Sequence, residues 1–128
     1  MNRVRKLEAC KAAYDAMQAQ LHFVELHGSV VCQMHDTVSI LSESKAAAER
    51  ALDVARQNYK ESVPSAMAAL YGLDGRVYDV LFRYYVLGCT TRTIAMQRGE
   101  SHRTVTKAKA RGLQILAALE FEKEDAHE

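Results

Sequence analysis

Apolar side chains recur at alternating intervals of three and four residues through the first part of the chain. They are Leu7, Cys10, Tyr14, Met17, Leu21 and Val24. This spacing places them on one face of an α-helix and is typical of a helix that packs lengthwise against another. A second helical stripe follows, at Val38, Leu41, Ala48, Leu52, Ala55, Tyr59 and Val63 or Ala66. Two such helices of opposite direction predict a long helical hairpin.

Glycine marks the expected end of the first helix. This helix should run from near Asn2 to Gly28, because glycine often ends a helix. Residues 30–36 fit a loop, a short helix or an ordered connector, and the sequence does not choose among these alternatives. The second helix should begin near Asp36 or Thr37.

Proline interrupts the second stripe. Pro64 lacks an N–H and disfavours helix at the preceding residue, so it should kink the helix or start a new one with Ser62 as its cap. The segment after Pro64 should run to Gly72, which suits a helix C-terminus. With one proline in 128 residues, no tryptophan and abundant helix formers, we expect an all-α fold.

Turn-forming residues divide the C-terminal third into short helices. The expected caps and stops are Asp74, Gly88, Thr90, Gly99 and Ser101. The helices between them should cover about 75–87, 91–97 and 102–119. Residues 1–72 are thus predicted to form a helical hairpin for packing or dimerisation, residues 73–119 a helix-turn-helix domain, and residues 120–128 an acidic, solvated tail.

Positive charge is concentrated in the middle of this C-terminal part. The whole chain has a net charge of +1, but residues 76–112 hold eight basic and two acidic side chains. The acidic side chains lie mainly before and after this block. A basic segment beside a turn between two helices predicts a polyanionic partner.

Three small or apolar positions give the turn its character. Ala95 should lie where two helices cross, and Gly99, four residues later, should occupy a tight turn that needs positive φ. Val105 should fill the core from the second helix. Each position has a steric reason, and the three spacings together predict a helix-turn-helix.

The segment from Leu73 to Leu116 resembles the DNA-binding fourth region of bacterial sigma factors. The residues that carry the resemblance are "VLFRYYVLG", "TIAMQRGES", "TV" and "RGLQIL". The layout of the whole chain is similar to that of ArpU-type regulators of phages and prophages. Two residues depart from the sigma-like pattern: Thr93 stands where Glu is usual, and Arg98 stands where an apolar residue is usual.

The resemblance implies a DNA-reading role for the helix at about 101–118. Base contacts would fall on Arg103, Thr104, Lys107 and His102, and phosphate contacts on Thr91, Arg92, Ser101 and Lys109. Thr106 is also a candidate because it should project outward from the same helix, and Arg111 is a candidate because it belongs to the basic block. The predicted DNA-binding residues are therefore Thr91, Arg92, Ser101, His102, Arg103, Thr104, Thr106, Lys107, Lys109 and Arg111.

These patterns favour a DNA-binding transcriptional regulator of phage or prophage origin that binds double-stranded DNA as a homodimer through residues 2–70. One alternative is a sigma-like interaction module that binds RNA polymerase, and another is a small terminase-type DNA-packaging subunit. No catalytic motif is present, so we expect no enzymatic activity. Three widely spaced cysteines and the absence of an apolar 20-residue run predict a cytoplasmic protein that is not in a membrane.

Four residues around the expected end of the first helix are of metal-ligating types. His22, His27, Cys32 and His35 are suitable zinc ligands by type, but their spacing matches no common closed zinc site. We therefore expect no metal ion and no other cofactor.

Overall fold

The computed structural model describes residues 2–33 and 38–126, and the side chains of residues 2–26 and 44–120. In this part of the chain every regular element is helical, which confirms the all-α prediction. The elements are α1 (Arg3–Gln33), α2 (Val38–Ala69), α3 (Gly75–Leu81), the π-helical turn η2 (Phe82–Val86), α4 (Thr91–Arg98) and α5 (His102–Ala126). None of the described helices is both long and apolar enough to cross a membrane.

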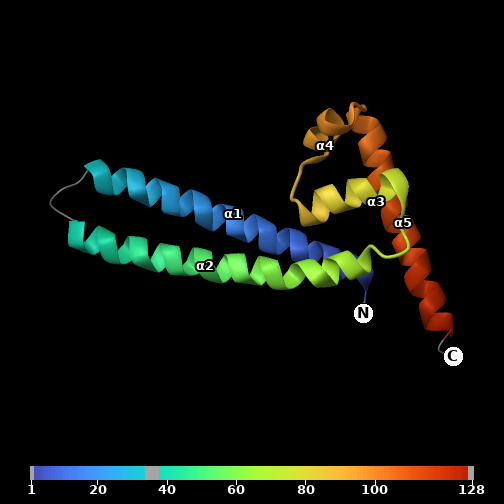
Figure 1. Ribbon diagram of the computed structural model, residues 1–128, viewed down its shortest axis with the longest axis horizontal. Helices are drawn as coiled ribbons and strands as arrows, with labels where there is room; N and C mark the ends of the chain where they lie inside the picture. Colours follow the sequence, from blue (N-terminus) through green and yellow to red (C-terminus); the bar gives the residue numbers. More distant parts are fainter. Residues whose placement is uncertain (1, 34–37, 127–128) are drawn as a thin grey trace.

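Helices α1 and α2 lie side by side in opposite directions and form the predicted hairpin, while the three shorter elements and α5 gather at its base (Figure 1). The first stripe faces inward, since Leu7 and Cys10 are fully buried. Opposite Leu7 and Cys10, α2 buries the small side chains of Ala66 and Ala69 in the same core, and nearer the other end of the hairpin it buries those of Ala48 and Ala55. These alanines let the two helix axes approach closely.

The expected stop at Gly28 is wrong, because α1 continues through this residue to Gln33. A glycine inside a helix costs only about 1 kcal/mol relative to alanine, and packing along a partner helix readily outweighs that cost. Residues 30–33 are therefore helical, whereas His35, Asp36 and Thr37 lie outside the described residues.

Pro64 neither starts a new helix nor ends α2, which runs through it to Ala69. The hydroxyl of Ser62 is not a cap, because it donates a hydrogen bond of 2.7 Å to the carbonyl of Tyr59 within the same helix. The proline ring removes one hydrogen bond of the helix, but the turn that follows it is packed in the core, where Ala66 and Ala69 are buried. A turn over residues 70–72 then leads to α3.

The base of the hairpin and the C-terminal helices share one hydrophobic core. Leu7 of α1, Leu70 after α2, Leu81 of α3 and Leu116 of α5 are all fully buried in it. Burying a leucine side chain contributes about 1.5–3 kcal/mol, so these contacts hold the two parts of the chain firmly together. The boundary predicted at residue 72 therefore falls within a continuous core.

The helix expected over 75–87 changes geometry halfway along. After α3, residues Phe82–Val86 form a π-helical turn, in which the N–H of Leu87 bonds to the carbonyl of Phe82 at 3.1 Å. This turn carries the Tyr84–Tyr85 pair, whose rings meet edge to face at 4.8 Å. Tyr85 is buried, and burial, more than nearby Tyr84 and Glu8, raises its pKa to about 12. Tyr85 therefore packs in the core, and Tyr84 is half-buried beside it.

Helix α5 extends to Ala126, seven residues beyond the expected end, so the segment 120–128 begins as helix and not as a frayed tail. Glu120 accepts a hydrogen bond of 3.2 Å from the backbone N–H of Arg3. This contact joins the C-terminal helix to the start of α1, and it gives a physical reason for the longer helix.

Candidate nucleic-acid interface

The turn between α4 and α5 has the predicted local chemistry. The hydroxyl of Thr90 accepts a hydrogen bond of 3.1 Å from the N–H of Thr93, and that of Ser101 accepts one of 3.1 Å from the N–H of Thr104. Gly99 has a φ of +66° and closes α4 in the left-handed conformation. Thr90 therefore begins α4, Gly99 ends it, and Ser101 begins α5 two residues later. Asp74 precedes α3 and occupies its cap position. Its side chain makes no capping hydrogen bond, so the predicted cap is not formed.

A small core of its own lies beneath this turn. Val80 of α3, Ile94 and Ala95 of α4, and Val105 and Ala108 of α5 are buried together. Ala95 and Val105 thus occupy the crossing and core positions that their spacing predicted. Helices α3, α4 and α5 pack around this small core, and the outward side chains of α4 and α5 are mounted on it.

Gly112 sets how closely α5 approaches α3. A Cβ atom at this position would lie 2.7 Å from Leu81 and 2.8 Å from Val77. The absence of a side chain at Gly112 lets the two helices touch, and this contact fixes the orientation of α5 relative to the rest of the domain.

An ion-pair network explains the unusual residue Arg98. Its guanidinium pairs with the carboxylate of Asp79 and, at 3.1 Å, with that of Glu100. Asp79 also accepts hydrogen bonds of 2.9 and 3.0 Å from Arg83, and Glu100 pairs with Arg76 at 3.1 Å. The guanidinium of Arg98 is therefore paired with two acids at the position where the sigma-like pattern has an apolar residue.

The network also changes the titration of Asp79. Partial burial alone would raise the pKa of Asp79, but the hydrogen bonds from Arg83 and Arg98 lower it below the ordinary value of 3.8. Because the folded state binds this proton less tightly than the unfolded chain, the carboxylate stabilises the fold above pH 3.8. That contribution is lost as the pH falls below 3.8.

We expect Asp79→Asn to lower the free energy of unfolding at pH 7 by about 1–3 kcal/mol, because it weakens charge-assisted hydrogen bonds that join α3 to the turn. The variant should also lose less stability than the wild type between pH 5 and pH 3. Urea denaturation at each pH measures both effects. Asp74→Asn is the matched control, since Asp74 is exposed and makes no capping bond. Equal losses for the two variants would show that the network does not stabilise the turn.

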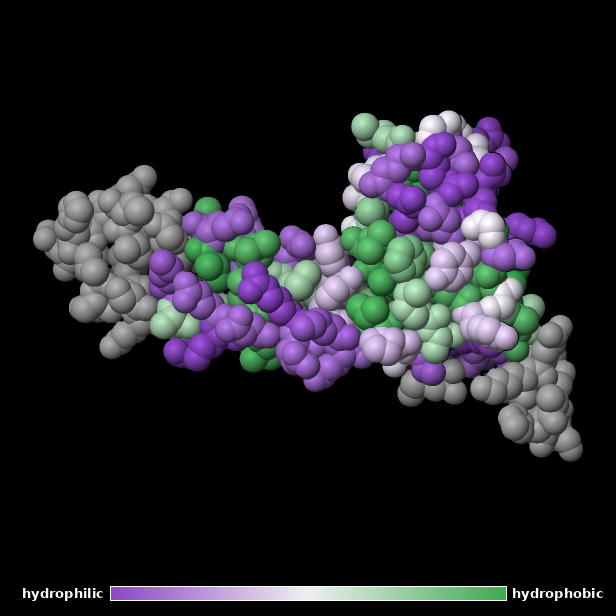
Figure 2. Space-filling view, viewed as in Figure 1, coloured by the Kyte–Doolittle hydropathy of each residue, from purple (hydrophilic) through white to green (hydrophobic). Residues whose placement is uncertain are grey.

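The network divides the basic block into two groups. Arg76, Arg83 and Arg98 are paired with the two acids of the block, Asp79 and Glu100. Among the described residues of the block, four further basic side chains are exposed and have no acidic partner: Arg92, Arg103, Lys107 and Arg111. Figure 2 shows hydrophilic side chains gathered over the lobe that α4 and the start of α5 form. The uncompensated charge of the block is therefore carried by α4 and α5.

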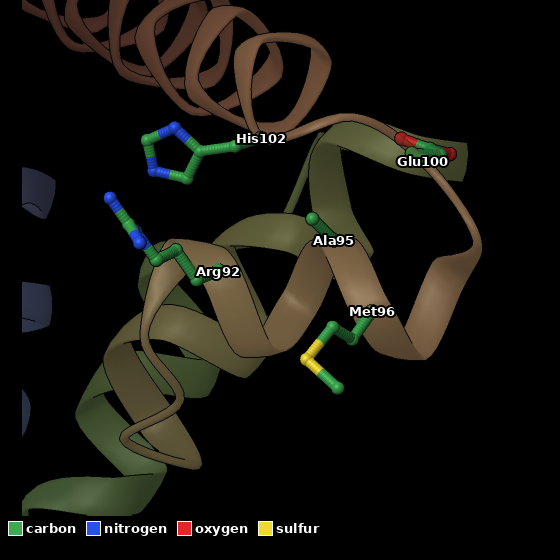
Figure 3. A pocket seen from close by; sticks show the side chains of 5 residues that line it. All are labelled: Arg92, Ala95, Met96, Glu100 and His102. Carbon is green, nitrogen blue, oxygen red and sulfur yellow. The ribbon is translucent and has the colours of Figure 1, made fainter.

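One flank of this surface joins the start of α4 to the start of α5. The hydroxyl of Thr91 lies 2.8 Å from Nε2 of His102, which brings the first turns of both helices together. Arg92 and His102 extend toward the same side of a hollow of about 330 Å³, while Met96 points away from them (Figure 3). Two helix N-termini, which favour anions, thus meet beside a guanidinium and an imidazole.

The other flank lies between α3 and α5. Thr104, Lys107 and Arg111 border a hollow of about 410 Å³, together with Arg76 of α3. Arg76 was not among the predicted residues, although its place in the basic block was a usable signal. Gln114 was also missed: it is exposed on the same face of α5 as Arg103 and Lys107, because residues 103, 107 and 114 lie on one side of a helix.

The structure places Lys109 apart from the other predicted contacts. Its ammonium lies 3.9 Å from the centre of the Tyr84 ring, and Lys11 of α1 approaches the same ring at 5.0 Å. A cation over an aromatic face is attracted to it. Lys109 therefore faces α1 and η2, away from Arg103 and Lys107, which conflicts with a phosphate contact on the outer face.

The remaining predicted residues support the start of α5. Ser101 and Thr104 are hydrogen-bonded through their hydroxyls at 2.8 Å, and Thr106 donates to the carbonyl of His102 at 2.9 Å. Ser101 and Thr106 are exposed, and Thr104 is half-buried. Their hydroxyls stabilise the first turns of α5 while lying beside the basic side chains.

Of the residues considered as metal ligands, His22 is exposed on α1, and the side chains of His27, Cys32 and His35 lie outside the described residues. In the part of the chain that the structure describes, no three His, Cys, Asp or Glu side chains lie close enough to hold a metal ion.

Comparison with known proteins found no relative of this chain. No protein-family model, curated protein or solved structure matches this chain. The functional interpretation therefore depends on the geometry and charge of the surface itself.

Proposed function

We propose that this protein binds double-stranded DNA through the helix-turn-helix of α3, α4 and α5 and acts as a transcriptional regulator. The observation that carries the proposal is the division of the basic block. The acids of the block neutralise Arg76, Arg83 and Arg98 beneath the turn, whereas Arg92, Arg103, Lys107 and Arg111 remain exposed.

This arrangement suits a duplex. The exposed start of α5 has the size and polarity of a helix that enters a major groove, where arginine can bond to guanine. Arg92 and the N-terminus of α4 lie beside it and suit a backbone phosphate. On the other flank, Lys107 and Arg111 border a second hollow, beside Thr104, that suits a phosphate of the opposite strand.

Binding of a mixed-sequence duplex tests the proposal and measures the phosphate contacts. Lys107→Ala should lower the slope of log affinity against log salt by about one unit, because one fewer counterion is released. Lys109→Ala is the matched control, since the same charge is removed two residues away but from the Tyr84 side of α5. Fluorescence anisotropy of the full chain over a salt series gives both slopes.

Three outcomes would contradict the proposal. Absence of salt-dependent binding to any duplex would favour the alternative of a module that binds RNA polymerase. Equal slopes for the two variants would place the contact on general surface charge and not on the outer face of α5. Ring-shaped oligomers on DNA would favour a packaging subunit.

A further inference from the structure

A hollow of about 410 Å³ lies where α3 meets α5, and we name it the α3–α5 hollow (Figure 1). Its inner lining is apolar, because Ala108 is buried and Val77 is half-buried. Its outer lining is polar and consists of Lys107 and Arg111, which are exposed, and the half-buried Thr104. Small-molecule sites are typically apolar clefts of about 300–1,000 Å³ with a few polar groups that orient the ligand. The α3–α5 hollow therefore has the size and the composition of such a site.

The polar side of this hollow carries positive charge that no acid neutralises. Lys107 and Arg111 lie one turn apart on α5, and within the described residues neither of them pairs with a carboxylate. Like charges at this spacing on a helix repel each other. Two other hollows, one at the start of α4 and one on α1, each include a glutamate in their lining, Glu100 and Glu8. The α3–α5 hollow has no acidic side chain in its lining, so its charge favours an anion.

Contacts within the protein hold the walls of the hollow in place. Val77 touches α5 at Gly112, where an added Cβ atom would lie 2.8 Å from the valine side chain. Ala108 belongs to the small core beneath the turn. Arg76 borders the hollow from α3, and its Nε donates a hydrogen bond of 3.1 Å to Glu100, which shares its charge. Because these walls are already packed, little conformational entropy is lost when a ligand enters.

We infer that the α3–α5 hollow binds a small phosphate monoester. The phosphate group lies between Lys107 and Arg111, whose guanidinium can bond to two phosphate oxygens at once. A monoester carries a charge of about −1.5 to −2 at pH 7, which balances both cations, whereas a diester carries only one charge. The organic part of the ligand lies against Val77 and Ala108. A nucleoside monophosphate has both parts and is the natural probe.

A bound monoester also competes with duplex DNA, and this competition rests on the proposed function. Lys107 and Arg111 are the residues on this flank that suit a phosphate of the duplex. One anion between them excludes another, so a phosphate monoester should lower the affinity for DNA. The monoester site itself does not depend on whether the protein binds DNA.

Titration of the full chain with thymidine 5′-monophosphate at constant ionic strength tests the site. The backbone amide signals of Val77 and Ala108 should shift in a saturable manner in NMR spectra. Arg111→Gln should weaken binding at least about tenfold, because charge-assisted hydrogen bonds to the phosphate are lost. Lys109→Gln is the matched control, since it removes a positive charge from the Tyr84 side of α5 and should leave the affinity nearly unchanged. Absence of saturable shifts in the wild type, or equal weakening by both variants, would overturn the site.

Two further probes separate the phosphate from the organic part of the ligand. Thymidine lacks the phosphate and inorganic phosphate lacks the organic part, so each should bind at least about tenfold more weakly than the monophosphate. Equal affinity for thymidine would overturn the role of Lys107 and Arg111. Equal affinity for inorganic phosphate would overturn the role of the apolar lining.

Competition against a fluorescent duplex separates the monoester site from DNA binding. Thymidine 5′-monophosphate should displace the duplex with the dissociation constant that the NMR titration gives. If the amide signals shift but no duplex binds, the DNA-binding proposal fails and the monoester site stands. If a duplex binds but the amide signals do not shift, the monoester site fails and the DNA-binding proposal stands. If both ligands bind without displacement, the overlap of the two sites is wrong.

Discussion

Gly88→Ala should destabilise the protein by about 2–5 kcal/mol. Gly88 has a φ of +73°, and a left-handed conformation costs an alanine about 1–2 kcal/mol. A Cβ atom here would also lie 2.1–2.5 Å from ring atoms of Tyr14, so the ring must move. Overpacking of this kind typically costs a further 1–3 kcal/mol, roughly. Urea denaturation of the full chain measures the total.

Gly99→Ala separates the two causes. Gly99 has nearly the same φ, +66°, and also follows a helix, but a Cβ atom there meets nothing within 4 Å. It should therefore cost only the backbone contribution of about 1–2 kcal/mol. If both variants lose the same stability, the contact between Tyr14 and Gly88 contributes nothing.

This contact matters because it orients α4 and the segment before it on the hairpin. Tyr14 belongs to α1, and Gly88 joins η2 to α4. Beside it, the hydroxyl of Tyr59 in α2 donates a hydrogen bond to the carbonyl of Val86. Both helices of the hairpin thus hold the segment that leads into α4, so a change at Gly88 should also disturb the position of the basic surface.

The turn between α4 and α5 was predictable because its requirements are local. Thr90 and Ser101 satisfy backbone N–H groups within three residues, and Gly99 supplies a backbone conformation that few residues adopt. The buried positions Ala95 and Val105 follow from the crossing of two adjacent helices. Such features depend on neighbours in the sequence, so the pattern of residue types is sufficient to place them.

Features that depend on distant contacts were not predictable. Whether Lys109 reaches solvent or an aromatic ring depends on where Tyr84 lies after the π-helical turn. The pairing of Arg98 required Asp79, nineteen residues earlier, to lie beside it. The helix end predicted at Gly28 was wrong for the same reason. The local preference of glycine for a helix end was weaker than the packing of α1 on α2.

Arg103→Ala should weaken binding to a selected DNA site by about 1–3 kcal/mol and should affect random DNA much less. Arg103 is exposed in the first turn of α5, the part of a helix-turn-helix that reaches base edges. A bidentate contact to guanine supplies discrimination of this size, whereas the positive charge of Arg103 alone adds little to sequence preference. The site can be obtained by selection from a random duplex pool with the wild-type chain.

Arg92→Ala is the matched control for this measurement. Arg92 lies at the start of α4 beside His102, where it suits a phosphate and not a base. Its removal should weaken binding to the selected and random duplexes by a similar factor. The ratio of the two affinities should therefore fall for Arg103→Ala and remain constant for Arg92→Ala. A constant ratio for both variants would assign Arg103 to the phosphate backbone and leave base reading to Lys107 or Gln114, which share its face of α5.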